Sequence, residues 1–133
     1  MKPLLGSWEA PLYAVLRIVS GFYFFMHGTQ KLFGWPGGQE TVPVGGLPFV
    51  AGVIELVAGL MIMLGFFTSI AAFIASGEMA VAYFMVHFPQ AFWPIQNQGE
   101  AAALFCFIFL YFAARGSGIW SVDAAMGRKS GTR

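Results

Sequence analysis

Charged residues are scarce in this 133-residue sequence, where they make up only 10% of the chain, against about a quarter of a soluble domain. Hydrophobic residues make up 58%, and the mean hydropathy is +0.71. This composition excludes an ordinary soluble domain and indicates an integral membrane protein. The formal net charge of +1 provides no strong field for nucleic acid or acidic substrates, so we expect no nucleic-acid partner.

Cysteine is almost absent, since the chain has a single one, Cys106, in its last apolar run. An intramolecular disulfide and a CxxC redox pair are therefore excluded, and Cys106 is interpreted as a small apolar filler. The sequence also lacks a haem or iron–sulfur ligand pattern, a glycine-rich nucleotide loop and a nucleophile elbow. We expect no covalently bound cofactor, and no complete enzyme in this chain alone.

What the sequence does contain is a set of long apolar runs, each close to the ~20 residues that span a bilayer. Backbone groups in lipid must be satisfied within their own segment, so these runs are predicted to be helices. The tryptophans all fall just outside the runs, which is the pattern of an interfacial aromatic belt. The prediction is an all-α, polytopic four-transmembrane-helix bundle forming one domain over 1–133, with spans at about 10–28, 47–64, 69–88 and 99–114.

The orientation follows from lysine and arginine. With four spans, both termini lie on one side of the membrane, and only Lys31 lies on the other. The positive-inside rule therefore predicts cytoplasmic termini. We interpret the N-terminal apolar run as a retained first span and not as a cleaved signal peptide. The cytoplasmic tail, 116–133, is expected to contain a short interfacial helix in its SVDAAM segment. The basic residues on the terminal side are Lys2, Arg115, Arg128, Lys129 and Arg133.

Three charged residues, Arg17, Glu55 and Glu78, fall near the middle of the first three spans. At 1.5 Å per residue they can share one layer, and each lies on a stripe of small residues where membrane helices approach closely. We expect them to face one another, with Arg17 paired to one glutamate and the other glutamate keeping its proton at neutral pH. They are interpreted either as structural ion pairs between helices or as functional residues, which would form a proton relay or the polar floor of a ligand cavity.

A second polar group is expected near the outer surface. His27 and Lys31 end the first span, His87 ends the third, and Glu100 begins the fourth. These residues are candidates for ligand binding, as a hydrogen-bonding lip for a headgroup such as a quinone. They could also be ordinary interfacial side chains. Nothing in their spacing demands a metal ion, so we predict no metal site.

The order and spacing of several segments resemble the DoxX family of membrane proteins (four-span, DoxX/DoxD-like). The resemblance covers about residues 13–126. It rests on the run LRIVSGFYFFMHGTQKLFGW, on GVIELVAGLMIMLGFFT, on Glu78, on QNQGE and on GSGIWSVDAAM. The QNQGE segment departs slightly from the N-G-G-E typical of the family, at Gln98, and keeps Glu100 in place.

The resemblance implies a four-helix bundle in a bacterial-type inner (plasma) membrane and a link to respiratory or thiol redox chemistry. Related proteins are small membrane subunits of thiosulfate:quinone oxidoreductases, and others associate with redox-defence enzymes. The function expected is therefore a small membrane subunit of a quinone-linked oxidoreductase, with a quinone as ligand and with lipids and a partner subunit or larger complex around it. The alternatives are a structural or assembly subunit of a membrane complex and a small transporter.

Overall fold

The computed structural model describes residues 1–128. The residues described are helical and contain no strand, which confirms the predicted all-α class. Residues 129–133 of the predicted cytoplasmic tail lie outside the described part. In chain order the elements are η1 (Gly6–Trp8), α1 (Glu9–Phe33), α2 (Leu47–Leu64), α3 (Thr68–Ala82), the π-helical η2 (Tyr83–His87), η3 (Phe88–Gln90), α4 (Pro94–Asn97), α5 (Glu100–Arg115) and α6 (Val122–Ala125).

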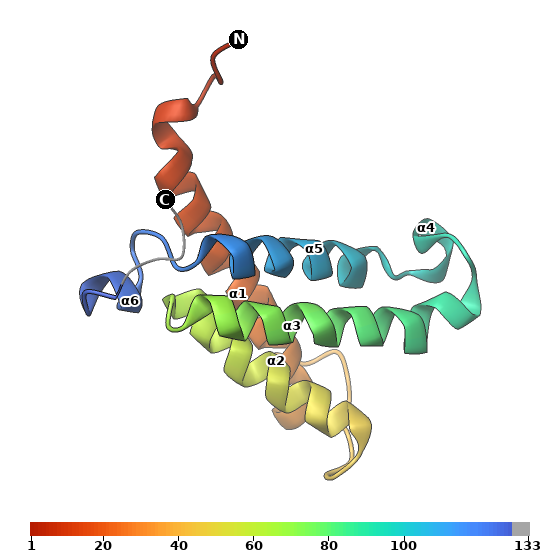
Figure 1. Ribbon diagram of the computed structural model, residues 1–133. Coiled ribbons are helices and arrows are strands. Elements are labelled where there is room, and N and C mark those ends of the chain that lie inside the picture. Colours follow the sequence, from red (N-terminus) through yellow and green to blue (C-terminus); the bar gives the residue numbers. More distant parts are fainter. Residues whose placement is uncertain (129–133) are drawn as a thin grey trace.

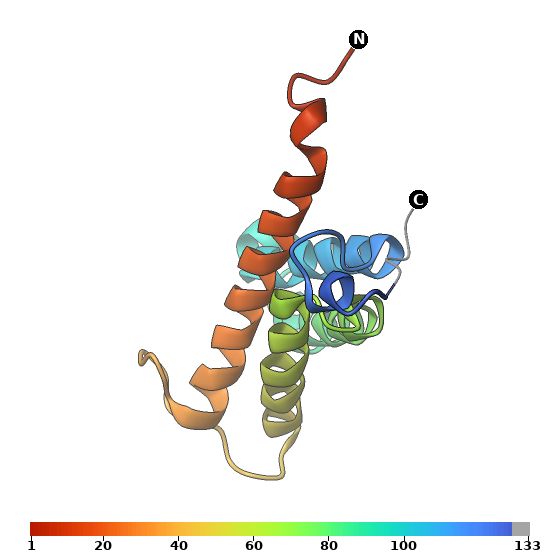
Figure 2. The same ribbon diagram turned by 90° about the vertical axis from the view of Figure 1, so that its left-hand side faces the viewer.

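The four long helices form two antiparallel hairpins, α1 with α2 and α3 with α5 (Figure 1). The hairpins meet near the α2–α3 turn and are inclined to each other. In Figure 2, α1 and α2 run side by side while α3 and α5 are seen nearly end-on. As a result, the loop between α1 and α2 and the connection that contains α4 lie at separate ends of the molecule.

Glycines set the register of the first hairpin. A Cβ atom built on Gly21 would lie 2.4 Å from the backbone nitrogen of Met63, and one built on Gly28 would lie 2.4 Å from that of Leu56. Gly59 of α2 faces the backbone of Phe25 in the same way, at 2.5 Å. The two backbones are therefore in direct contact, as is typical of small-residue interfaces between membrane helices.

Alanines and phenylalanines fill the second hairpin and join it to the first. Ala72 and Ala75 of α3 are fully buried, and so are Phe109 and Phe112 of α5. Phe24 of α1 packs against Phe109 with the ring centroids 4.8 Å apart. The core therefore lies where α1 crosses α5, and the rest of the helical surface is rich in exposed apolar side chains.

Two helical stretches, Leu47–Leu64 and Thr68–Gln90, are long and apolar enough to cross a membrane. The other two long helices differ from them for identifiable reasons. α1 has 25 residues but includes Arg17, His27 and Lys31, and α5 has only 16 residues, short of the ~20 that span a ~30 Å core. The membrane character is supported by this surface, while the crossing by all four helices stays a prediction.

The observed helices differ from the predicted ranges mainly in α1 and α3. α1 continues to Phe33 and ends at Gly34, which has a φ of 74°, a conformation that favours glycine. α3 changes to a π-helix at Tyr83. The short helix expected in the SVDAAM segment is present as α6.

Candidate functional site

The most buried ion pair of the described residues joins the two helices of the first hairpin. Glu55 lies near the middle of α2 and its side chain is 1% exposed. The Nζ atom of Lys31 donates to both of its carboxylate oxygens, at 2.6 and 2.7 Å. Both oxygens therefore have a charged donor, the arrangement that a buried carboxylate requires.

Lys31 reaches Glu55 because of the direction in which helical side chains point. Its Cβ atom lies beside Gly52, where a Cβ would approach it to 3.2 Å. Side chains lean toward the N-terminus of their own helix, and α1 runs antiparallel to α2. The lysine chain therefore extends about one turn back along α1, to the level of Glu55.

Glu78 of α3 completes the group, which we call the carboxyl cluster (Lys31, Glu55 and Glu78). Glu55 and Glu78 lie the same number of residues on either side of the turn between Phe66 and Phe67, so antiparallel packing of α2 and α3 brings them to one level. Glu55 and Lys31 are the charged groups that act on the Glu78 carboxyl group. Its Oε1 atom is buried and has no hydrogen-bond partner within the described part of the chain.

The predicted meeting of Glu55 and Glu78 is therefore present, but the predicted pairing with Arg17 is wrong. The guanidinium of Arg17, which is fully buried, donates to backbone carbonyls. Its Nε atom binds Ile62 at 3.0 Å, and its two terminal nitrogens bind the carbonyls of Ser117, Ile119 and Trp120.

The physical reason is the register of the α1–α2 hairpin. The glycine contacts place Gly21 beside Met63, so Arg17, one turn earlier, lies at the end of α2. It is about 21 Å along α1 from Lys31 at 1.5 Å per residue. Arg17 therefore belongs to the opposite end of the hairpin and not to the layer of the glutamates.

Around Arg17 the chain after α5 folds back onto the α2–α3 turn. We call this region the Arg17 clasp (Arg17, Ile62, 65–68 and 116–123). Asp123 accepts hydrogen bonds from the backbone N–H of Phe67 at 2.9 Å and from the hydroxyl of Ser117 at 2.7 Å. The Ser117 hydroxyl also contacts Thr68 Oγ1 at 2.8 Å. The clasp therefore joins all four long helices: α1 provides Arg17, α2 and α3 provide their ends at the turn, and α5 leads into residues 116–123.

The outer polar residues are not brought together as one site. Lys31 belongs to the carboxyl cluster, whereas Glu100 is exposed in the first turn of α5. His87 Nδ1 lies 3.0 Å from the carbonyl oxygen of Asn97, in the connection that contains α4, which lies apart from the loop between α1 and α2 (Figure 1). A role of His27, Lys31, His87 and Glu100 in ligand binding stays a prediction, and the four residues do not form a single site.

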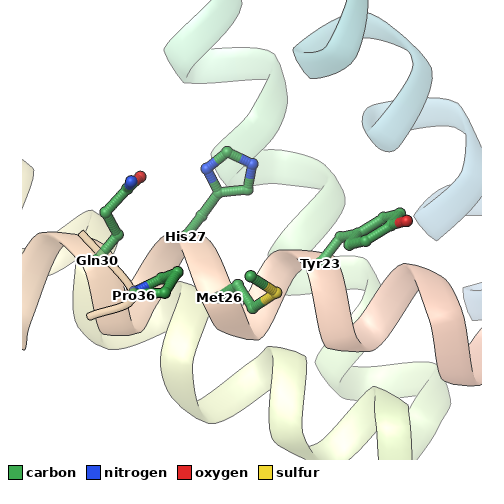
Figure 3. Close-up of a pocket in the computed structure, with 5 residues that line it drawn as sticks. All are labelled: Tyr23, Met26, His27, Gln30 and Pro36. Atoms are coloured by element: carbon green, nitrogen blue, oxygen red, sulfur yellow. The ribbon is translucent and has the colours of Figure 1, made fainter. Parts of the chain in front are cut away.

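His27 borders an open pocket of about 160 Å³ on the surface of α1. The hydrogen bond from Gln30 Nε2 to the carbonyl oxygen of Gly37, 2.6 Å long, holds the loop after α1 beside it. His27 is also one helical turn from Lys31, so the pocket neighbours the carboxyl cluster along α1. Figure 3 shows the lining residues: Tyr23, Met26, His27, Gln30 and Pro36.

Within the described residues, no group of three or more His, Cys, Asp or Glu side chains could hold a metal ion. The polar side chain that holds the connection between η3 and α5 has a structural role. Asn97 is fully buried, and its amide donates to the Tyr83 hydroxyl at 3.1 Å and to the Ala91 carbonyl at 3.0 Å. Its side-chain oxygen accepts from the N–H of Gly99 at 2.8 Å.

Sequence reasoning missed the role of Lys31 as the cation of the cluster, and the roles of Ser117 and Asp123 in the clasp. A signal for Lys31 was its place on the same helical face as Gly28 and Phe24, at spacings of three and four. The GSGIWSVD segment that follows α5 has no comparable periodicity, and its contacts with Arg17 are made by backbone carbonyls.

The comparisons with known proteins agree with this membrane architecture. The chain is 44% identical over 128 residues to an uncharacterized protein of Haemophilus influenzae, covering 90% of this chain and 93% of that one. It is 27% identical over 123 residues to the putative oxidoreductase CatD of Bacillus subtilis, covering 88% and 90%. No solved structure matches it. The DoxX family model matches residues 12–88, more than half of the sequence, and the chain therefore belongs to the DoxX family.

Proposed function

We propose that this chain is a small membrane subunit of a quinone-linked oxidoreductase system, in which the carboxyl cluster handles protons. The observation that carries the proposal is a buried Glu55 bound to the partly buried Lys31, with a second carboxyl group beside them, one of whose oxygens has no partner. Ionisable groups at membrane depth are costly and are kept mainly for such work. A relative that is called a putative oxidoreductase supports the redox part of the proposal.

The proposed topology has all four long helices crossing a bacterial-type inner membrane, with both termini in the cytoplasm. α1 is 25 residues long, which exceeds the ~20 that a span needs. α5 is shorter and ends at Arg115, whose guanidinium pairs with Glu9 near the start of α1. This pair, together with the other basic residues near the termini, favours the cytoplasmic side for that end.

The proposed chemistry divides between this chain and a partner. Reduction of a quinone to a quinol takes up two electrons and two protons. The electrons would come from the redox centre of a partner oxidoreductase subunit, because this sequence has no haem, iron–sulfur or nucleotide motif. The carboxyl cluster would supply protons to the quinone oxygens and recover them from water.

The pocket beside His27 is the site that best fits a quinone headgroup. Ligand pockets usually enclose about 300–1,000 Å³, so this hollow of about 160 Å³ fits a single ring and not a complete isoprenoid quinone. Tyr23 and His27 are exposed at its edge, so the tail of the ligand would stay among the lipid chains. His27, Gln30 and Tyr23 would offer hydrogen bonds to the ring oxygens.

The experiment is to purify the protein with its partners from native membranes and to measure bound quinone by extraction and chromatography. We expect quinone and a redox-enzyme subunit to co-purify, and quinol formation to fall in Glu55→Gln. Replacement of His27 by leucine should reduce the quinone content, while Phe33→Leu, a matched change on the exposed end of α1, should not. Absence of both quinone and a redox partner would contradict the proposal.

A small carrier is the second candidate, and one observation favours it. Glu78 is only partly buried although it lies next to the fully buried Glu55, so the cluster has a side at which a proton or solute would be exchanged. Flux of protons or solute in proteoliposomes, abolished by Glu55→Gln and independent of added quinone, would favour a carrier. Lack of any flux would leave the oxidoreductase subunit as the better proposal.

A further inference from the structure

The two carboxyl groups of the carboxyl cluster have unlike surroundings. Glu55 is 1% exposed, and the Nζ atom of Lys31 binds both of its oxygens. Glu78 is partly buried, and its Oε1 atom has no hydrogen-bond partner in the described part of the chain. The cluster therefore has one cation and one fully satisfied carboxylate, together with a second carboxyl group that has one oxygen without a partner.

Charge balance decides which group holds a proton. Two adjacent carboxylates in an apolar environment repel each other, and an ionised carboxylate without donors loses hydration that nothing replaces. Lys31 can neutralise only one of them. α5 also packs against α3, and its charged residues, Glu100 and Arg115, lie at its two ends, so α5 provides no second cation at the level of Glu78.

We propose that Glu78 is the residue that carries the exchangeable proton of the cluster, while Glu55 stays bound to Lys31. This assignment names the residue that would handle the proton in the proposed function. Its role in quinone reduction rests on that proposed function. In the transfer step the O–H bond of Glu78 breaks and an O–H bond forms on an oxygen of the ligand. Glu78 is left as a carboxylate and regains its proton from water.

The access to each group supports the same assignment. Glu55 is closed off by the direct backbone contact between α1 and α2, where Gly28 lies against Leu56. Glu78 belongs to the other hairpin and is partly exposed. Glu78 is therefore the more accessible residue of the two, and it can exchange its contacts without breaking the Lys31–Glu55 pair.

Infrared spectroscopy of the full-length protein in lipid nanodiscs tests the assignment at pH 7. The carbonyl stretching band of a protonated carboxyl group should shift in Glu78→Asp and disappear in Glu78→Gln. It should stay in place in Glu55→Asp and in Glu40→Asp, a control in the exposed α1–α2 loop. Far-UV circular dichroism verifies that each variant folds.

A charge change at the lysine gives an independent measurement. In Lys31→Met, Glu55 loses its cation and should also take up a proton, so the band area should rise roughly twofold. A band that follows Glu55→Asp, or one that neither aspartate variant moves, would overturn the assignment. A band that follows Glu78, in a protein that binds no quinone, would support the assignment and count against the oxidoreductase proposal alone.

Discussion

The two ends of the α1–α2 hairpin bury a positive charge in different ways. At the Arg17 clasp, the guanidinium donates to four backbone carbonyls of residues 62, 117, 119 and 120. At the carboxyl cluster, the Lys31 ammonium binds Glu55 while a neighbouring carboxyl oxygen has no partner in the described residues. Carbonyls cannot change their protonation state, whereas carboxyl groups can. The clasp is therefore suited to maintaining the fold, and the cluster to the proton transfer proposed above.

The largest expected effect comes from removing the charge of the clasp. Arg17→Met removes the guanidinium donor from four carbonyls of the clasp, of which that of Ile62 keeps the N–H of Gly65. We expect a loss of about 3–5 kcal/mol in the free energy of unfolding. The midpoint of thermal unfolding in detergent measures it. Arg17→Lys should be intermediate, because an ammonium cannot reproduce the planar fork of donors. A variant as stable as the wild type would break the comparison.

The next largest loss of stability is expected at the backbone contact between α1 and α2, which lies between the Arg17 clasp and the carboxyl cluster. In Gly28→Ala the new Cβ atom would lie 2.4 Å from the backbone nitrogen of Leu56, so the helices must separate and the Lys31–Glu55 bond must lengthen. We expect a loss of about 1–3 kcal/mol, measured by the same unfolding experiment. Gly77→Ala is the matched control, because a Cβ atom there meets nothing within 4 Å. Equal effects of the two substitutions would contradict the packing.

A smaller effect is expected inside the clasp at Asp123, which accepts from Phe67 and Ser117 and pairs with Arg128. Asp123→Asn keeps the shape but loses charge-assisted acceptance, and we expect a loss of about 1–2 kcal/mol. The control is Glu9→Gln, which removes an exposed ion pair with Arg115 worth at most about 1 kcal/mol. If Glu9→Gln costs more than Asp123→Asn, the clasp is less important than its geometry indicates.

The smallest effect on stability is expected at the cluster itself. Glu78→Gln removes a carboxyl group that has an unsatisfied oxygen, so the free energy of unfolding should change by less than about 0.5 kcal/mol. Proton-coupled activity in native membranes should nevertheless be lost. Thermal unfolding and quinol formation, measured on the same preparation, test this separation. A strong loss of stability without loss of activity would assign Glu78 to the fold.

Much of this architecture could be predicted from sequence periodicity. The apolar runs and the tryptophans locate the long helices, and α2 covers the range 47–64 that was expected. The equal distances of Glu55 and Glu78 from the α2–α3 turn predict that they meet. Both predictions depend on local spacing, which the sequence shows directly.

The position of Arg17 could not be predicted in the same way, because it depends on the register between two helices. If every span had the same length and depth in the membrane, Arg17 would lie in the layer of the glutamates. The observed register is set by Gly21 and Gly28 against the backbone of α2, and α1 continues to Phe33. The clasp could not be predicted either, since the acceptors of Arg17 are main-chain carbonyls, which every residue has.

The carboxyl cluster is divided between the two hairpins, with Lys31 and Glu55 on one and Glu78 on the other. Close backbone packing makes the α1–α2 pair stiff, so a change in the inclination of α3 and α5 would alter the spacing between Glu78 and the ion pair. Proton affinity at Glu78 would change with that spacing. A partner protein that tilts one hairpin against the other would thereby control when the proton is released.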